Sequence, residues 1–174
     1  GTTELLRAEP EQDGVAMTAA ILGGTSDISA GQLIDRTGVL LGLQFPAGKA
    51  LDALSAQAEK VKPFPVKVEN CTFSLSGMEN KVKQMAEKGE APETVARFAL
   101  ETVARAVVKA TRQALERFPG LPVLCSGGVA SNSLLRQVME RECGAIFAQP
   151  RFSTDNAMGT AILTWRALER ERTQ

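Results

Sequence analysis

The stretch VLCSGGVASNSLLRQ, residues 123–137, is the most informative segment for the fold. A run with the character of a buried strand ends at Gly127 and Gly128, and a helix begins shortly afterwards. The two glycines allow backbone amides to approach a ligand, and a helix N-terminus favours an anion or the polar edge of a nucleotide. The segment predicts a nucleotide-binding turn or, alternatively, a tight strand-to-helix turn in which Ser131 or Asn132 caps the helix.

Strands and helices alternate on either side of this segment. AIFAQP follows it as a short strand, and a helix begins at about Thr154. Apolar residues at helical spacing after Pro92 predict a long helix, and the chain opens with a hairpin whose strands we expect at residues 2–8 and 15–22. This order favours one α/β domain, residues 1–174, with a mixed sheet flanked by helices. Further helices are expected at residues 29–41, 46–60, 77–88 and 132–141.

The composition limits the chemistry that the chain can perform. Its 174 residues are 44% hydrophobic, enough for one buried core. Twenty Lys and Arg residues balance twenty Asp and Glu residues, so no net field gathers nucleic acid. The absence of histidine removes the commonest general base and transition-metal ligand. The available groups are carboxylates, hydroxyls, lysines and the backbone.

Cysteine usage and hydropathy predict the compartment. The three cysteines form neither an even disulfide framework nor a CxxC pair, so we expect a reducing cytoplasm. No apolar run is long enough to span a bilayer, and GTTELLRAE has no feature of a secretion signal. We expect a cytoplasmic protein without membrane contact, and the abrupt start at a glycine suggests an excised domain.

The segment RFSTDNAMGTAI contains a candidate metal ligand. Thr154 can cap a helix there, and Asp155 lies in its first turn, where the helix dipole favours an acid. Capping alone accounts for this pattern. If Asp155 instead points into a cleft, its carboxylate is a hard metal ligand.

The segment DISAGQLIDRTGVLLGLQFPAGKALD contains a row of small residues. Gly31, Asp35, Gly38 and Gly42 share one face of the expected helix. Glycine is costly inside a helix, so this face predicts close approach of a backbone or a ligand, with Asp35 holding a sugar hydroxyl. The alternative is close helix packing with Asp35 solvated at its edge.

A capping pattern lies in FSLSGMENKV. Ser76 precedes an expected helix and Glu79 follows three residues later, which is the sequence of a capping box. We expect only a structural role for this segment.

Taken in order, DISAGQLIDRTGVLLGLQFPAG, FSLSGMENKV, LCSGGVASNSLLR and FSTDNAMGTAI resemble the tRNA threonylcarbamoyladenosine synthase family, the O-sialoglycoprotein endopeptidase-like or glycoprotease proteins. The resemblance covers nearly the whole chain, and residues 1–3 are similar to the end of the family's phosphate turn. It implies the actin-like ATPase (ribonuclease H-like) fold, with this chain as the C-terminal lobe and the N-terminal lobe absent. The family transfers threonylcarbamoyl from its adenylate to the exocyclic amine of an adenosine beside the anticodon of tRNA.

The resemblance also implies site residues and partners. Asp155 is this lobe's one ligand to an iron- or zinc-type divalent metal, whose other ligands are two histidines of the N-terminal lobe. The implied partners are that lobe, other subunits of the threonylcarbamoylation complex and tRNA, and the isolated chain is expected to be inactive. The implied contacts to an adenine nucleotide or threonylcarbamoyl-adenylate are Asp35, Gly48, Asp52, Gly127, Gly128 and Asn132.

The sequence departs from the family pattern around the expected cleft. Thr2 replaces a histidine, Ile28 and Gln32 replace acidic residues, and Ala47 replaces the first of two glycines. These departures leave open a non-catalytic nucleotide-binding or scaffold paralogue that is a partner in the same modification complex. A small-molecule kinase of the same superfamily is a third reading, but we find no catalytic-base aspartate in a recognisable setting.

Overall fold

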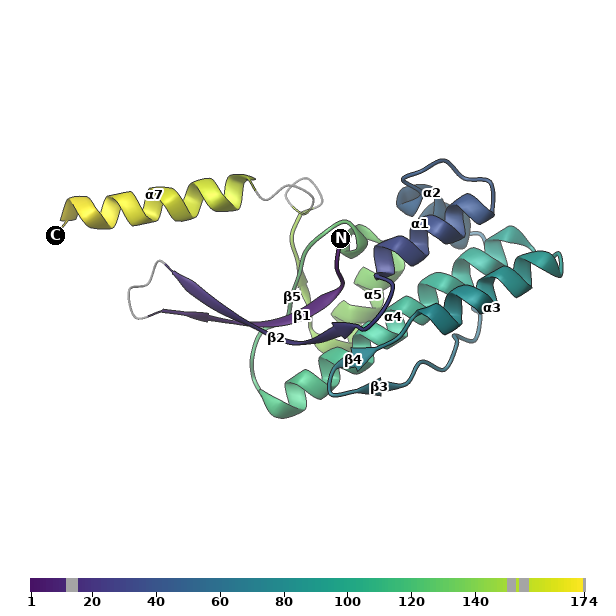
Figure 1. Cartoon of the computed structure of the whole chain (residues 1–174), viewed down its shortest axis with the longest axis horizontal. Helices are drawn as coiled ribbons and strands as arrows, with labels where there is room; N and C mark the ends of the chain where they lie inside the picture. Colours follow the sequence, from purple (N-terminus) through teal and green to yellow (C-terminus); the bar gives the residue numbers. More distant parts are fainter. Residues whose placement is uncertain (12–15, 150–152, 154–156, 174) are drawn as a thin grey trace.

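The chain begins with the expected antiparallel hairpin, formed by β1 (Glu4–Pro10) and β2 (Met17–Thr25). The computed structural model describes residues 1–11, 16–149, 153 and 157–173. Each strand begins two residues later than expected from the sequence. The pairing is regular beyond an irregularity between Leu5 and Leu6, and the hairpin projects from the helical body (Figure 1).

β2 continues into a mixed sheet with the strand order β1-β2-β4-β3. β2 pairs with β4 in parallel, and β4 pairs with β3 antiparallel. The amide of Gly24 donates to the carbonyl of Cys71 at 3.0 Å. A Cβ at Gly23 would lie 2.3 Å from that same carbonyl oxygen, so this crossing requires glycine. The two short strands are β3 (Val68–Glu69) and β4 (Thr72–Phe73).

A second, parallel pair of strands follows the long helix. It consists of β5 (Leu124–Cys125) and β6 (Ile146–Phe147). The expectation that LPVLCS is a buried strand is wrong, because only two residues pair and Leu124 is 72% exposed. Cys125 and Phe147 face the core, whereas Leu124 and its partner Ile146 lie on the outer face.

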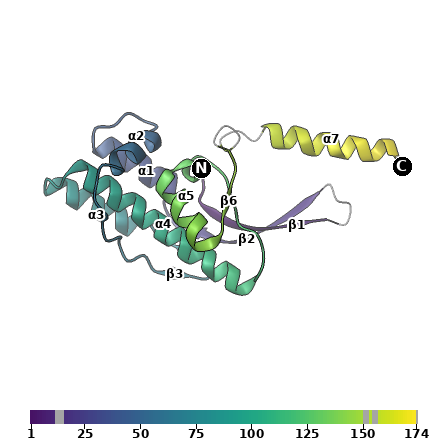
Figure 2. The same ribbon diagram turned by 180° about the vertical axis from the view of Figure 1, so that it is seen from behind.

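The long helix α4 organises the helical body. Pro92 occupies its first turn, and Val95, Phe98 and Val103 belong to one core cluster while Leu100 and Val108 belong to the other. α1, α2, α3 and α5 all pack against α4 (Figures 1 and 2). The helices are α1 (Ala30–Leu40), α2 (Gly48–Ser55), α3 (Ser76–Glu87), α4 (Pro92–Arg117), the short 3₁₀ turn η1 (Val129–Ser131), α5 (Ser133–Cys143) and α7 (Ala157–Thr173).

Helix ends differ from the expected ones where a turn intervenes. α1 ends at Leu40, and Gly42 lies beyond it with φ 82°, so Gly42 is not on the helix face predicted for it. α2 begins at Gly48 and ends at Ser55, so it is shorter than expected. None of the helices in the described part of the chain is long and apolar enough to cross a membrane.

Candidate functional site

Asp35 links α1 to the beginning of α2. Its Oδ1 accepts a hydrogen bond from the amide of Ala47 at 2.8 Å, immediately before the first residue of α2, Gly48. A Cβ at Gly48 would have only Ile34 Cγ2 nearby, at 3.9 Å, so packing within the chain does not require glycine there. Asp35 therefore positions the N-terminus of α2 with one carboxylate oxygen.

The glycine row on α1 is explained in part by helix packing. A Cβ on Gly38 would lie 2.2 Å from Cβ of the fully buried Ala47, so α1 and α2 can meet only because residue 38 is glycine. A Cβ on Gly31 would make only ordinary contacts, with Val129 at 3.6 Å and with Ser29 Oγ at 3.9 Å. The packing alternative thus accounts for Gly38, while it does not account for Gly31.

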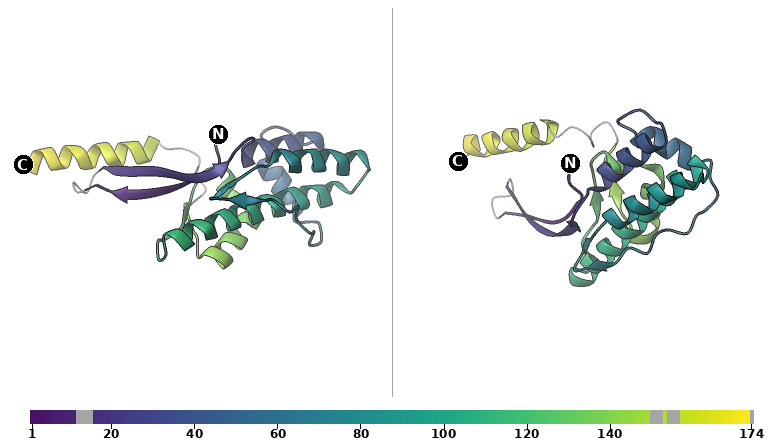
Figure 3. Two further views of the ribbon diagram at one scale, coloured as in Figure 1. Left: turned by 60° about the horizontal axis from the view of Figure 1, so that its bottom comes forward. Right: turned by 45° about the vertical axis from the view of Figure 1, so that its right-hand side comes forward.

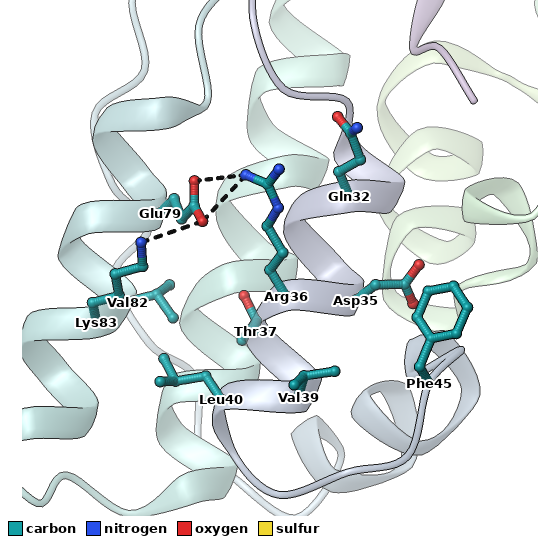
Figure 4. A pocket seen from close by; sticks show the side chains of 10 residues that line it. All are labelled: Gln32, Asp35, Arg36, Thr37, Val39, Leu40, Phe45, Glu79, Val82 and Lys83. Atoms are coloured by element: carbon teal, nitrogen blue, oxygen red, sulfur yellow. Dashed lines mark hydrogen bonds and ion pairs between the residues drawn. The ribbon is translucent and has the colours of Figure 1, made fainter.

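Asp35 also lies at the edge of a surface groove of about 500 Å³ between α1 and α3 (Figure 4). The close-up shows the Asp35 side chain turned toward the exposed ring of Phe45. Glu79 of α3 pairs across the groove with Arg36 of α1 at 3.2 Å, and on its own helix with Lys83 at 3.5 Å. The ion pair therefore joins α1 to α3, and Asp35 points away from it, toward Phe45.

Asp52 of α2 is bonded to the N-terminus of α5. Its Oδ1 accepts from Asn132 Nδ2 at 2.8 Å and from Ser133 Oγ at 2.9 Å, and its Oδ2 accepts from the Ser133 amide at 2.9 Å. Three hydrogen bonds thus join residues 80 or 81 positions apart in the sequence. The structure brings together two of the predicted contact residues, Asp52 and Asn132.

Asn132 is the N-cap of α5, as one reading of the sequence predicted. It has extended backbone geometry, and its Oδ1 accepts from the Leu135 amide at 2.9 Å. Only 8% of Asn132 is exposed. With one amide hydrogen donated to Asp52, the side chain keeps a second N–H for a further partner.

The two glycines before η1 differ in what the fold demands of them. Gly127 has φ 98°, and its amide and carbonyl both bond to the Ser153 hydroxyl, at 2.8 and 3.1 Å. Gly128 has ordinary helical angles, and a Cβ there would have nothing within 4 Å. Gly127 is therefore explained by the turn, whereas Gly128 leaves open space above its backbone.

The metal prediction falls on Asp155, which lies outside the described residues together with Thr154. Within the described residues, no group of three or more Cys, Asp or Glu side chains is arranged to hold a metal ion. The chain has no histidine, so its own donors there are carboxylates and thiols.

Cys125 and Cys143 are not activated nucleophiles. Burial raises the pKa of the Cys125 thiol to about 11, with a further contribution from Cys143. Burial also raises the pKa of Cys143. Both side chains pack against the second core cluster as small apolar groups, and the chemistry of the site has to come from other residues.

Sequence reasoning missed Asp27. Its carboxylate accepts from the Ser74 hydroxyl and from the amides of Leu75 and Ser76, at 2.9 and 3.3 Å for the amides. Asp27 therefore joins the loop after β2 to the start of α3. The expected capping box at Ser76 is wrong, because Leu75 is the N-cap and no side chain caps it. The missed signal was an acid in one loop opposite hydroxyls in a distant one, which no local pattern reveals.

Asp27 makes acid stability depend on this contact. Burial alone would raise the pKa of its carboxyl, but hydrogen bonds from Ser74, Leu75 and Ser76 outweigh it and lower the pKa from 3.8 to about 2. A depressed folded-state pKa adds stability that is present above 3.8 and is lost as the pH falls toward about 2. We expect Asp27→Asn to be less stable than wild type near neutral pH. The free energies of unfolding of the two proteins should become equal as the pH falls to about 2. Urea unfolding of wild type and Asp27→Asn at several pH values measures this. A difference in the free energy of unfolding that stays constant with pH would contradict it.

The sequence profile of the tRNA N6-adenosine threonylcarbamoyltransferase family matches residues 13–162. The chain belongs to this family. It is 34% identical over 158 residues to the tRNA N6-adenosine threonylcarbamoyltransferase of Thermus thermophilus, covering 86% of this chain and 48% of that protein. The Maricaulis maris protein of the same name is 33% identical over 192 residues, covering 98% and 50%. The chain thus spans about half the length of these curated relatives.

A solved structure supports the same fold. The crystal structure of T. kodakarensis HypF superposes with a TM-score of 0.59 at 23% identity, covering 81% of this chain and 18% of that one. The expected mixed α/β architecture of actin-like ATPases, with a mixed sheet flanked by helices, is confirmed.

Three departures from the family pattern have local structural roles. Gln32 accepts from the Ser29 amide at 3.0 Å while its own amide bonds Ser29 Oγ, which forms the capping box of α1. Ala47 fills the space left by Gly38. Ile28 packs at the border of the first core cluster. Nothing in the structure explains Thr2.

Proposed function

We propose that this chain is the C-terminal, nucleotide-contacting lobe of a tRNA threonylcarbamoyltransferase. The observation that carries the proposal is the convergence of Asp52, Asn132 and the Gly127–Gly128 turn at the N-terminus of α5. Family membership supports the reaction type, and the open backbone at Gly128 supports close approach of a ligand.

The charges at this helix terminus favour a particular part of the ligand. A helix N-terminus attracts anions, but here the Asp52 carboxylate already accepts from the Ser133 amide. A phosphate at the same point would meet that negative charge. The remaining N–H of Asn132 and the open backbone therefore suit a neutral nucleoside edge, and the phosphate of the adenylate is expected further away.

Asp35 suits a sugar hydroxyl. One oxygen is committed to Ala47, and the carboxylate lies at the edge of the groove beside Phe45. An ionised carboxylate accepts hydrogen bonds through both oxygens. In this proposal Gly48 leaves room beside Asp35, and α2 connects the Asp35 contact to the Asp52 contact.

The chain orients the ligand but supplies only part of the site. We propose that Asp155 joins histidines outside this chain in holding an iron- or zinc-type metal, since one carboxylate without histidine is a poor transition-metal site. Such a metal would polarise the carbonyl under attack. With 20 cationic and 20 anionic side chains, the chain has no net charge to draw in tRNA, which fits recognition shared with other subunits.

Gly128→Leu tests the nucleotide contact. We expect weak, about millimolar adenosine monophosphate binding by the chain, and at least about a tenfold loss in the variant, because the side chain fills the space the ligand needs. Stability should change little, since nothing lies within 4 Å of the new Cβ. Ligand-observed NMR with thermal melts measures both.

The matched control is Gly77→Ala in α3, where the new Cβ would have only the Phe64 ring within 4 Å, at 3.9 Å. Undiminished binding in Gly128→Leu would move the nucleotide site away from this turn. In a protein of the relatives' full length, Gly128→Leu should also lower threonylcarbamoyl transfer to tRNA. An intact transfer rate there, with impaired nucleotide binding, would favour the scaffold alternative.

A further inference from the structure

The loop between α1 and α2, residues 41–47, turns one aromatic ring outward. Leu41 and Leu43 pack against the core clusters, whereas Phe45 is 74% exposed. Both views of Figure 3 show this loop on the outer surface of the helical body. A single exposed apolar side chain is common on protein surfaces, so the meaning of Phe45 depends on what surrounds it.

The loop is fixed to α1 on both sides of Phe45. The amide of Leu43 donates to the carbonyl of Gly38 at 2.9 Å, and the amide of Ala47 donates to Asp35 Oδ1 at 2.8 Å. Phe45 lies midway between these two anchors, so its backbone is in place before any ligand arrives. A surface that is already ordered loses less conformational entropy on binding.

Phe45 lies beside the carboxylate to which we assign a ribose contact. Figure 4 shows its ring next to the Asp35 carboxylate, and both side chains line the groove of about 500 Å³. A volume of this order suits a small ligand. A nucleoside joins a hydroxylated sugar to a flat base, and bases stack on aromatic side chains. A sugar hydroxyl on Asp35 therefore brings the base within reach of the Phe45 ring.

The spacing along α2 suits the same ligand. From Ala47, at the Asp35 contact, to Asp52 the helix rises by about 8 Å. Asp52 in turn bonds the side-chain amide of Asn132. A nucleoside is long enough to bridge the loop and this amide, with the face of its base toward Phe45 and an edge toward Asn132.

We propose that Phe45 is the stacking surface for the adenine base of the adenylate whose ribose Asp35 holds. This assignment rests on the nucleotide-contacting role proposed above and adds a residue that selects the base. A phenyl ring offers no hydrogen bond, so it discriminates by stacking strength, which favours a purine over a pyrimidine. The other candidate occupants are a base of the tRNA and a cationic side chain from the rest of the protein.

NMR titration of adenosine monophosphate into the 174-residue chain tests the stacking. We expect the adenine H2 and H8 signals to move upfield on binding, because protons above a phenyl ring are shielded. Phe45→Leu should lower the affinity by about tenfold and abolish this upfield shift, whereas Phe45→Trp should keep both. Cytidine monophosphate should bind wild type more weakly than adenosine monophosphate does, and Phe45→Leu should bind the two nucleotides alike.

Leu40→Ala is the matched control. Leu40 is an exposed apolar residue that lines the same groove, on the side of α3 in Figure 4. The variant should leave the affinity for adenosine monophosphate unchanged. An equal loss in Leu40→Ala and Phe45→Leu would show that the groove contributes only general apolar surface, which overturns the stacking.

Three other outcomes also overturn it. If Gly128→Leu lowers the affinity and Phe45→Leu does not, the nucleotide site stands without the stacking; if neither does, or wild type does not bind, both proposals fail. If Phe45→Leu weakens binding of an anticodon-loop RNA but not of adenosine monophosphate, the ring belongs to the tRNA. If Phe45→Leu in a protein of the relatives' full length lowers the melting temperature and leaves nucleotide affinity unchanged, the ring packs against the rest of that protein.

Discussion

Gly38→Ala is expected to lower the free energy of unfolding by about 2 kcal/mol. The new methyl group would lie 2.2 Å from Cβ of Ala47, which is fully buried, so α1 and α2 must separate. The clash exceeds the gain of about 1 kcal/mol that alanine brings inside a helix. For a chain of this length the melting temperature should fall by about 4–8 °C.

Gly31→Ala on the same helix is the control for Gly38→Ala. Its Cβ would make only ordinary contacts, with Val129 at 3.6 Å and Ser29 Oγ at 3.9 Å, so we expect unchanged or slightly raised stability. Calorimetric melts of the two variants separate packing from helix propensity. Equal melting temperatures for Gly38→Ala and wild type would mean that α1 and α2 are not in the contact described. Since Asp35 bonds the Ala47 amide, Gly38→Ala should also weaken nucleotide binding.

Asn132→Asp should have a comparable or larger effect, and one that depends on pH. Aspartate still caps α5, but it replaces a 2.8 Å hydrogen bond to Asp52 with a repulsion between two carboxylates. We expect a loss of about 2–4 kcal/mol at neutral pH. The two neighbouring carboxyl groups bind a proton more tightly in the folded protein than in the unfolded chain, so their folded-state pKa is raised. The variant should therefore regain stability at low pH and lose it as the pH rises. Urea unfolding across the pH range measures this.

Two further variants isolate the cause. Asn132→Ser keeps a capping acceptor and adds no charge, so its loss should be about 1 kcal/mol and independent of pH. The double variant Asp52→Asn plus Asn132→Asp reverses the hydrogen bond and should recover part of the stability at neutral pH. A pH-independent loss in Asn132→Asp, or no recovery in the double variant, would show that the two side chains are not coupled.

The sequence by itself determined the main helices, the opening hairpin and the turn before α5. Apolar spacing after Pro92 predicted α4, because one stripe at 3.6 residues per turn is a local property of the chain. The turn before α5 and its N-cap at Asn132 were also readable, since capping joins residues a few positions apart. Four motifs in order were enough to indicate the family that the profile match then established.

Only the tertiary structure decided which of these residues act on one another. Asp52 meets Asn132, and Asp27 meets Ser74, across long sequence separations that no periodicity encodes. The tertiary structure also distinguished the two kinds of glycine. Gly38 is required by helix packing, whereas nothing would lie close to a Cβ at Gly128. The physical reason is that hydrogen bonding and close packing depend on distances of a few ångströms, whereas a sequence pattern fixes only which face of an element a side chain occupies.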